Sequence, residues 1–184
     1  ELGRLEPRVG EAIVSAADEI LNGALRDQFV VDIYQAGAGT SHNMNVNEVL
    51  ANRASELLGG AKGEYRLTHP NDHVNMGQST NDVFPSATRI ALLLGHGPLA
   101  DAARALAVSL HRKAGEFASV LKVGRTHLQD AVPMTLGQEF SGYAASIRRG
   151  ADDIAATDCQ LVELNLGGTA VGTGLNAGEP FERH

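Results

Sequence analysis

An apolar stripe between residues 99 and 121 most constrains the fold of this 184-residue chain. Its members are separated by 4, 3, 4, 4, 3 and 4 residues, so they share one face of an α-helix that begins at Pro98. They are Leu99, Ala103, Leu106, Leu110, Ala114, Phe117 and Leu121. A second stripe predicts another long helix, of roughly 43 Å, over residues 136–164. Two helices this long cannot cover their own apolar faces, so the pattern indicates a bundle completed by other chains.

Capping residues and glycines mark the ends of the other predicted elements. Thr135 and Gln138 match a capping box at the start of the second long helix. Earlier helices are predicted from Pro7 to just before Gly23, over residues 46–58 behind an Asn45 cap, and from Asn81 or Asp82 to residues 95–97. Residues 29–35 are expected to form a short strand or an extended segment, and residues 124–133 a loop.

The composition favours a mainly α fold, because aromatic residues make up only 4% of the chain and alanine and leucine dominate. We expect a small, partial helical domain with polar loops at residues 1–78. Residues 79–184 are expected to form the beginning of a long-helix central bundle.

Charge and apolar content exclude several classes of function. The formal net charge of −7 argues against binding to nucleic acid or to an anionic membrane surface. No apolar run approaches the roughly 20 residues of a membrane-spanning helix. The chain opens at Glu1 without a signal peptide, and it is expected to be a piece of a longer protein. Cys159 is the single cysteine, which fits a reduced, cytoplasmic setting.

Residues 69–82 hold the densest cluster of hydrogen-bonding side chains. Ten of these fourteen residues carry polar or titratable groups, without helical or strand periodicity. Neutral donors dominate its second half, namely Gln78, Ser79, Thr80 and Asn81, and an apolar run follows from Val83. Donors at the start of a helix suit a small anion such as a carboxylate.

Three further polar loops lie beside predicted helix ends, at residues 37–45, 124–130 and 167–174. Capping and turn chemistry accounts for any one of them, but less well for all together. His127 lies only three residues before Asp130, which is placed to orient its imidazole. Asp72 and Asp82 are interpreted as acids of turns or caps.

Two other kinds of site are disfavoured. His69, Asp72 and His73 lack a standard zinc spacing, so no metal site is expected. The glycines at residues 37–39 and 167–174 lack the lysine of a phosphate-binding loop and the surrounding βαβ unit. No cofactor is expected.

At these loops the chain resembles the fumarase–aspartase family of lyases. The segments that carry the resemblance are GAGTSHNMNVNEVLANRA, HPNDHVNMGQSTNDVFP, GRTHLQDAVPMTLGQEF and GGTAVGTGLN, and the match extends from about Leu5 to Asn176. Ser79-Thr80-Asn81-Asp82 and the Lys62–Tyr65 insertion look more like aspartate ammonia-lyase than like fumarase.

The resemblance implies a mostly helical homotetramer whose active sites are shared between subunits. By position, the residues that contact a dicarboxylate substrate are Thr40, Ser79, Thr80, Asn81, Thr126 and His127, with His127 and Thr126 as the catalytic pair. His69, Asn71 and Asp72 match an accessory dicarboxylate site of fumarases. The reaction implied is reversible elimination of ammonia from L-aspartate to give fumarate through an enediolate, without a cofactor.

One departure limits this expectation. The catalytic serine of the family lies in a GSSxMPxKxN loop, and no such segment occurs in these 184 residues. Two alternatives therefore stay open: hydration of fumarate to malate, and a non-catalytic scaffold or inactive fragment.

Overall fold

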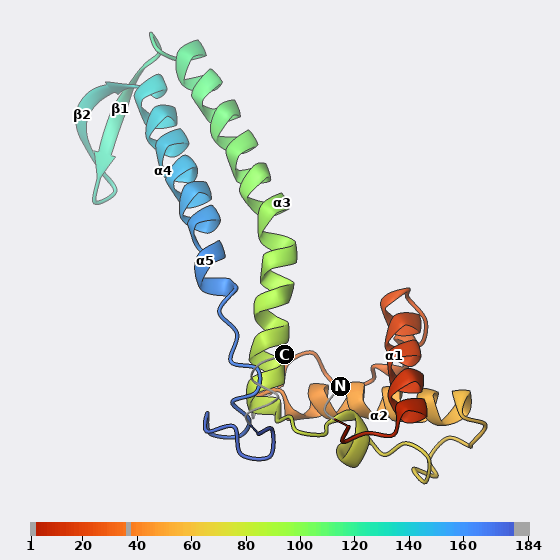
Figure 1. Ribbon diagram of the computed structural model, residues 1–184. Helices are drawn as coiled ribbons and strands as arrows, with labels where there is room; N and C mark the ends of the chain where they lie inside the picture. Colours follow the sequence, from red (N-terminus) through yellow and green to blue (C-terminus); the bar gives the residue numbers. More distant parts are fainter. Residues whose placement is uncertain (1–2, 36–37, 179–184) are drawn as a thin grey trace. The chain divides into compact units, whose positions relative to one another are not determined.

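The computed structural model describes residues 3–35 and 38–178, and it is mostly helical, which confirms the mainly α expectation (Figure 1). Gly37, in one of the predicted polar loops, lies outside the described residues. The elements are α1 (Pro7–Leu21), η1 (Arg26–Gln28), α2 (Thr40–Leu57), η2 (Pro70–Val74), α3 (Thr80–Glu116), β1 (Leu121–Thr126), β2 (Gln129–Thr135), α4 (Leu136–Ala156) and α5 (Asp158–Leu161).

The chain divides into two compact units. Unit 1 comprises residues 1–88 and 164–184, and unit 2 comprises residues 89–163. The bounds of these units differ from the expected division after residue 78, because unit 1 also includes residues 79–88 and 164–184. The two-domain assignment stays a prediction. In each unit, local signals in the sequence explain most helix ends.

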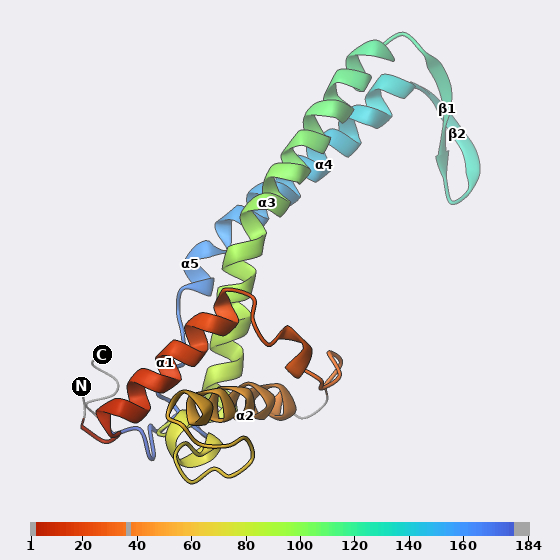
Figure 2. The same cartoon turned by 90° about the vertical axis from the view of Figure 1, so that its right-hand side faces the viewer.

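In unit 1, α1 packs on α2 through small side chains (Figure 2). Ala12, Ala16 and Ala54 are buried in this contact, and alanines let two helix backbones approach closely. A bidentate ion pair joins the same two helices, with Arg53 Nε 2.5 Å and Nη2 2.9 Å from the carboxylate oxygens of Glu19. The Arg53 guanidinium lowers the pKa of Glu19.

The helix after the first polar loop begins earlier than predicted. α2 starts at Thr40, behind a left-handed Gly39, so the expected start at Val46 was wrong. Asn45 lies inside the helix, where its side chain binds the backbone of Gln28 and Val30 instead of capping. The segment 29–35 forms no strand and is held partly by these bonds. The predicted end near Leu58 was confirmed, because α2 ends at Leu57 and Leu58 is its C-cap.

α3 begins near Asn81, as predicted, but continues past the expected stop at residues 95–97. Gly95, Gly97 and Pro98 lower helix stability locally, and an interior proline costs about 3 kcal/mol. Within unit 2 the helix is nevertheless held by an ion pair before the proline, at His96, and by the burial of Ala100 and Ala107 after it. His96 of α3 pairs with Asp158 of α5.

In unit 2, α3 and α4 run side by side (Figures 1 and 2). In this unit their buried residues are small and repeat every seven positions, namely Ala100, Ala107 and Ala114 on α3 and Gly137, Ala144 and Ala151 on α4. At Gly137 an added Cβ would lie 2.5 Å from the backbone oxygen of Ala114. The seam is therefore built on alanine and glycine, and Leu99 and Leu106 of the predicted stripe stay exposed in the single chain.

The second long helix is interrupted. The capping box of Thr135 and Gln138 was confirmed at the start of α4, but the helix ends at Ala156 instead of near residue 164. Thr157 turns its hydroxyl back onto the carbonyl of Ile154 at 2.7 Å, which competes with the helical backbone pattern. The short helix α5 follows.

Residues 121–135 form an antiparallel hairpin and not the predicted loop. β1 and β2 pair from Leu121 with Thr135 to Thr126 with Gln129, which leaves His127 and Leu128 as a two-residue turn. Both turn residues have positive φ, 51° and 61°. Such turns are usually made by Asn and Gly, which explains why the sequence concealed this hairpin.

Candidate functional site

The start of α3 carries three of the predicted substrate-binding residues. Ser79 acts as the cap, because its Oγ accepts the backbone N–H of Asn81 at 3.2 Å. Ser79 and Thr80 are half-buried and Asn81 is exposed. The positive end of a 37-residue helix therefore lies beside neutral hydroxyl and amide donors, an arrangement suited to a carboxylate.

The buried carboxylate of Asp82 joins this helix start to the glycine-rich loop at residues 167–174. Its Oδ1 accepts the backbone N–H of Ser79 at 2.9 Å. Its Oδ2 accepts the N–H of Gly167 at 3.2 Å and that of Thr169 at 2.8 Å. The interpretation of Asp82 as a cap acid was correct but incomplete. The spacing Ser79-x-x-Asp82 is a capping-box pattern, so the sequence itself indicates the capping role of Asp82. It does not indicate the bonds to Gly167 and Thr169.

Two further bonds connect the loop to Asn81. The Nδ2 of Asn81 donates to the carbonyl of Ala170 at 2.8 Å. The Nδ2 of Asn165 donates to the carbonyl of Asn81 at 3.0 Å. Both segments were predicted to be polar loops beside helix ends, but the hydrogen bonds between them were not predicted.

Thr40, the predicted residue from the first loop, lies at the start of α2. The preceding Gly39 is buried with φ 78°, and a Cβ there would lie 2.6 Å from the ring of Phe84. Since Phe84 belongs to α3, this contact fixes the start of α2 against the start of α3 within unit 1. Thr40 and residues 79–81 are thus positioned by neighbouring helix ends.

A cluster of three hydrogen-bonded asparagines, Asn43, Asn47 and Asn75, connects α2 to the segment before Ser79. The Oδ1 of Asn75 accepts the side-chain amides of Asn43 at 3.2 Å and Asn47 at 3.0 Å. Asn43 and Asn47 are buried on α2. Because these buried amides are satisfied by one another, they hold the segment before Ser79 in place.

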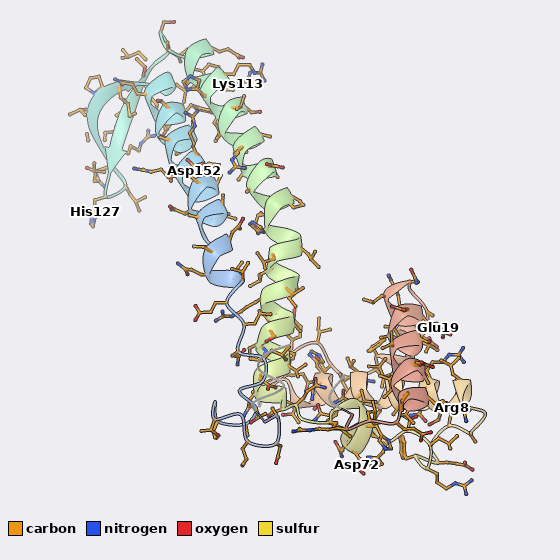
Figure 3. All side chains as sticks on the ribbon, in the orientation of Figure 1. Arg8, Glu19, Asp72, Lys113, His127 and Asp152 are labelled. Atoms are coloured by element: carbon orange, nitrogen blue, oxygen red, sulfur yellow. The ribbon has the colours of Figure 1, made fainter. Side chains whose placement is uncertain are left out.

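The predicted accessory-site residues form a tight local turn. The Nδ1 of His69 accepts the backbone N–H groups of Asn71 and Asp72, both at 3.2 Å. The backbone N–H of His69 donates to Nδ1 of His73 at 2.8 Å. His69 thus caps η2, while the Asp72 side chain is exposed. Figure 3 labels Asp72 on this turn.

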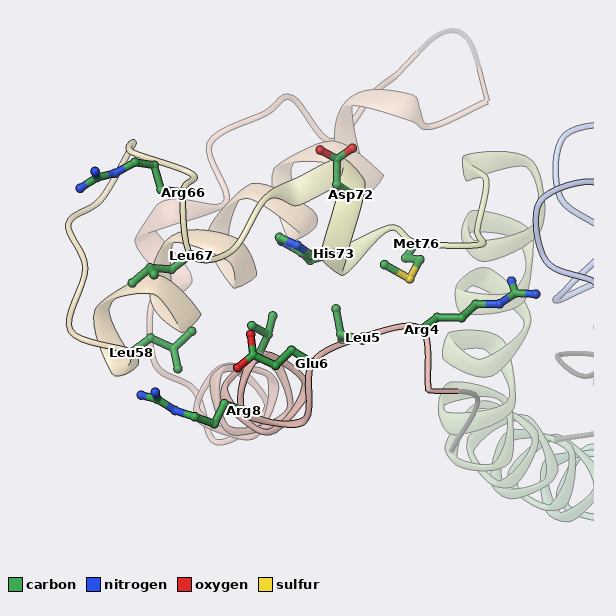
Figure 4. A pocket seen from close by; sticks show the side chains of 11 residues that line it. Arg4, Leu5, Glu6, Arg8, Leu58, Arg66, Leu67, Asp72, His73 and Met76 are labelled. Atoms are coloured by element: carbon green, nitrogen blue, oxygen red, sulfur yellow. The ribbon is translucent and has the colours of Figure 1, made fainter.

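A pocket of about 380 Å³ lies on one side of η2, and Figure 4 shows it. Asp72 and His73 line it together with Arg8 and Arg66, but His69 and Asn71 do not. Arg4 also lines it, and its guanidinium donates to the carbonyl of Ala177 at 2.7 Å. Of the expected accessory set, this pocket therefore includes only Asp72.

Thr126 and His127 lie at the tip of the hairpin in unit 2 (Figure 3). Both are exposed, and His127 is held in the left-handed region with φ 51°. The expectation that Asp130 orients His127 was wrong, because Asp130 pairs with its cross-strand partner Arg125 at 3.1 Å. The predicted site residues thus fall into two groups, one in each unit.

Near the base of the hairpin, Lys122 of β1 contacts Glu139 of α4 at 2.6 Å. The Lys122 ammonium holds the pKa of Glu139 below its usual range. Within residues 3–35 and 38–178, no group of three or more His, Cys, Asp or Glu side chains is placed to hold a metal ion. In the same part of the chain, no helix is long and apolar enough to cross a membrane.

Comparison with known proteins supplies relatives that cover nearly the whole chain. An aspartate ammonia-lyase of Bacillus sp is 56% identical over 96% of this chain and 38% of its own length. A class II fumarate hydratase of Bordetella parapertussis is 54% identical over 98% of this chain and 39% of its own length. The chain therefore spans less than half the length of these relatives.

Solved structures agree with these relatives. A fumarate lyase:delta crystallin from Brucella melitensis bound to cobalt superposes with a TM-score of 0.84, at 51% identity, over 99% of this chain and 40% of that one. A class II fumarase from Schistosoma mansoni gives a TM-score of 0.81 at 45% identity, over 99% and 38% of the two chains. The family described as Lyase matches residues 1–184. This chain belongs to that lyase family, whose relatives here include aspartate ammonia-lyases and class II fumarate hydratases.

Proposed function

We propose that the protein containing this chain removes ammonia reversibly from L-aspartate to give fumarate. The observation that carries the proposal is the start of α3, where Ser79, Thr80 and Asn81 surround the positive end of a long helix. Such a site binds a substrate carboxylate without a full counter-charge. Membership of the lyase family supports the same class of reaction.

The chemical difficulty is proton removal from the carbon beside a carboxylate, which is a very weak acid. The proton leaves readily only if fixed donors stabilise the enediolate that forms. Thr40, Ser79, Thr80 and Asn81 would supply donors from unit 1, and Thr126 and His127 from unit 2. Loss of one such donor costs about 3 kcal/mol of transition-state stabilisation.

The general base is expected outside these 184 residues, because no GSSxMPxKxN segment occurs in them. The covered share of the relatives, 38% and 39%, is consistent with this division. By themselves the 184 residues are therefore proposed to act as an inactive fragment or scaffold.

Hydration of fumarate is the second candidate, and relatives named fumarate hydratase support it as well as the aspartate ammonia-lyase relatives support the first. Ser79-Thr80 is the feature of this sequence that favours aspartate. Both reactions pass through a carbanion beside a carboxylate, so the two candidates use the same donors.

We also propose a homotetramer that shares active sites between subunits. Large apolar side chains of unit 2, including Leu94, Leu99 and Val108, are exposed in the single chain, and a bundle of several chains would cover them. The division of the site residues between the two units is consistent with a shared site. A cytoplasmic location is supported by the single cysteine.

An accessory dicarboxylate site at His69, Asn71 and Asp72 is also proposed. The exposed side chains of Asn71 and Asp72 support it, although the Nδ1 of His69 already accepts two backbone N–H groups.

Variants of the hairpin tip test the proposal in the full-length protein. Thr126→Ala and His127→Ala are expected to lower turnover about a hundredfold with little change in melting temperature, since both side chains are exposed. Gln129→Ala, at the other end of the turn, is the matched control, and it should leave turnover and melting temperature unchanged. Parallel loss of turnover and melting temperature would contradict the proposal.

A further inference from the structure

The Asp82 carboxylate does more than a helix cap requires. Capping needs one oxygen for the N–H of Ser79, and Oδ1 performs that function at 2.9 Å. Oδ2 instead accepts the backbone N–H groups of Gly167 and Thr169, which lie 85 and 87 residues further along the chain. Asp82 is 0% exposed, so these bonds are shielded from water.

We propose that Asp82 is a positioning residue for Asn81, acting through the loop at residues 167–170. This inference rests on the proposed function, because it assigns Asn81 to the substrate. Asp82 fixes the loop, and the loop fixes the Asn81 side chain through the carbonyl of Ala170.

The carbonyl of Ala170 fixes the orientation of the Asn81 side-chain amide, with its nitrogen toward the loop. A carbonyl only accepts, so the end of the amide beside it is the nitrogen, 2.8 Å away. The Oδ1 acceptor and the second N–H are then directed away from the loop. An acceptor suits the ammonium group of aspartate or the hydroxyl of malate, and an N–H suits a carboxylate. If the loop moves, the amide is free to rotate and both functions are lost.

Thr169 provides independent support, because its conformation is costly. Its φ is 56°, in the left-handed region that β-branched residues rarely adopt. Thr169 is only 6% exposed, and its hydroxyl has no hydrogen-bond partner in the part of the chain that the structure describes. Strain of this kind persists where surrounding contacts impose it, and here the N–H of Thr169 is held by Asp82 at 2.8 Å.

A double-mutant cycle in the full-length enzyme tests the inference. It compares Asp82→Asn, Asn81→Ala and the double variant, with kcat and KM measured on whichever substrate is turned over. Asp27→Asn is the matched control, since it makes the same change at an exposed aspartate of unit 1. Asn165→Ala is a milder variant that loosens the same loop from an exposed position, in case Asp82→Asn does not fold.

The expected result is non-additivity. Asp82→Asn should lower kcat/KM about tenfold or more when Asn81 is present, and less than about threefold in the Asn81→Ala background. Asn165→Ala should show the same dependence on Asn81 with a smaller effect, and Asp27→Asn should leave kcat/KM unchanged. Effects that multiply, or an unchanged kcat/KM for both loop variants, would overturn the inference.

Succinate binding, measured by calorimetry, separates this inference from the proposed reaction. If the wild-type enzyme turns over neither aspartate nor malate, the proposed function fails. Weaker succinate binding by Asp82→Asn only when Asn81 is present would still support the positioning role. Equal weakening in both backgrounds, or no succinate binding by the wild-type enzyme, would refute it.

Discussion

Gly39 joins two helix starts, and replacing it with alanine should destabilise the protein by two separable effects. The residue has φ 78°, where a side chain costs about 1–2 kcal/mol. The new Cβ would also lie 2.6 Å from ring atoms of Phe84, and overpacking of this kind costs about 1–3 kcal/mol. Gly39→Ala is therefore expected to cost about 2–5 kcal/mol in total.

Gly59 offers a control that contains only one of the two effects. It has φ 87°, and an added Cβ would meet nothing within 4 Å. Gly59→Ala is thus expected to cost about 1–2 kcal/mol, from the backbone alone. Urea unfolding of the full-length variants measures both costs, and their difference isolates the contact with Phe84.

A second substitution checks the physical cause. If the ring of Phe84 obstructs the new methyl group, Gly39→Ala combined with Phe84→Leu should be destabilised by less than the sum of the single changes. Equal costs for Gly39→Ala and Gly59→Ala, together with additive effects of the double variant, would refute the reasoning.

Three further predictions concern unit 2. Glu139→Gln should lower the melting temperature at neutral pH, because the Lys122 ammonium lowers the pKa of Glu139 in the folded state. The pair stabilises the fold above the unfolded-state pKa of Glu139, so the difference from wild type should disappear as the pH falls through the lowered pKa; a difference that persists in acid would contradict it. Gly137→Ala should destabilise by about 1–3 kcal/mol in urea unfolding, because its Cβ would lie 2.5 Å from a backbone oxygen, whereas Gly142→Ala, with open space, should not destabilise. Leu128→Gly should stabilise the hairpin by up to about 1 kcal/mol with unchanged turnover, since Leu128 has φ 61° and is 95% exposed; a lower melting temperature would contradict that expectation.

The sequence predicted those elements whose ends are set locally. Pro7 at the start of α1, the Thr135 capping box and the glycine after α2 act on their immediate neighbours, and all three were confirmed. Pro98 predicted a boundary that does not exist, because the His96 ion pair before it and the buried Ala100 and Ala107 after it hold the helix in unit 2. The hairpin was missed because His127 and Leu128 occupy turn positions that usually belong to asparagine and glycine.

The candidate site divides in the same way. Ser79 and Asn81 were predicted at a helix start from neighbouring residues, and they lie there. The hydrogen bonds from Gly167 and Thr169 to the Asp82 carboxylate join residues more than eighty positions apart. A local sequence pattern cannot predict such contacts. Likewise, the sequence suggested that Asp130 orients the His127 imidazole. The strand register instead places Asp130 opposite Arg125, and these two side chains form an ion pair.

The substrate assay of the full-length protein tests the central claim most directly. Purified enzyme is supplied with L-aspartate and, separately, with L-malate, and the fumarate formed from each is measured. We predict fumarate and an equal amount of ammonia from aspartate, through the donors at the start of α3 and at the hairpin tip. Fumarate formed from malate alone would contradict the claim.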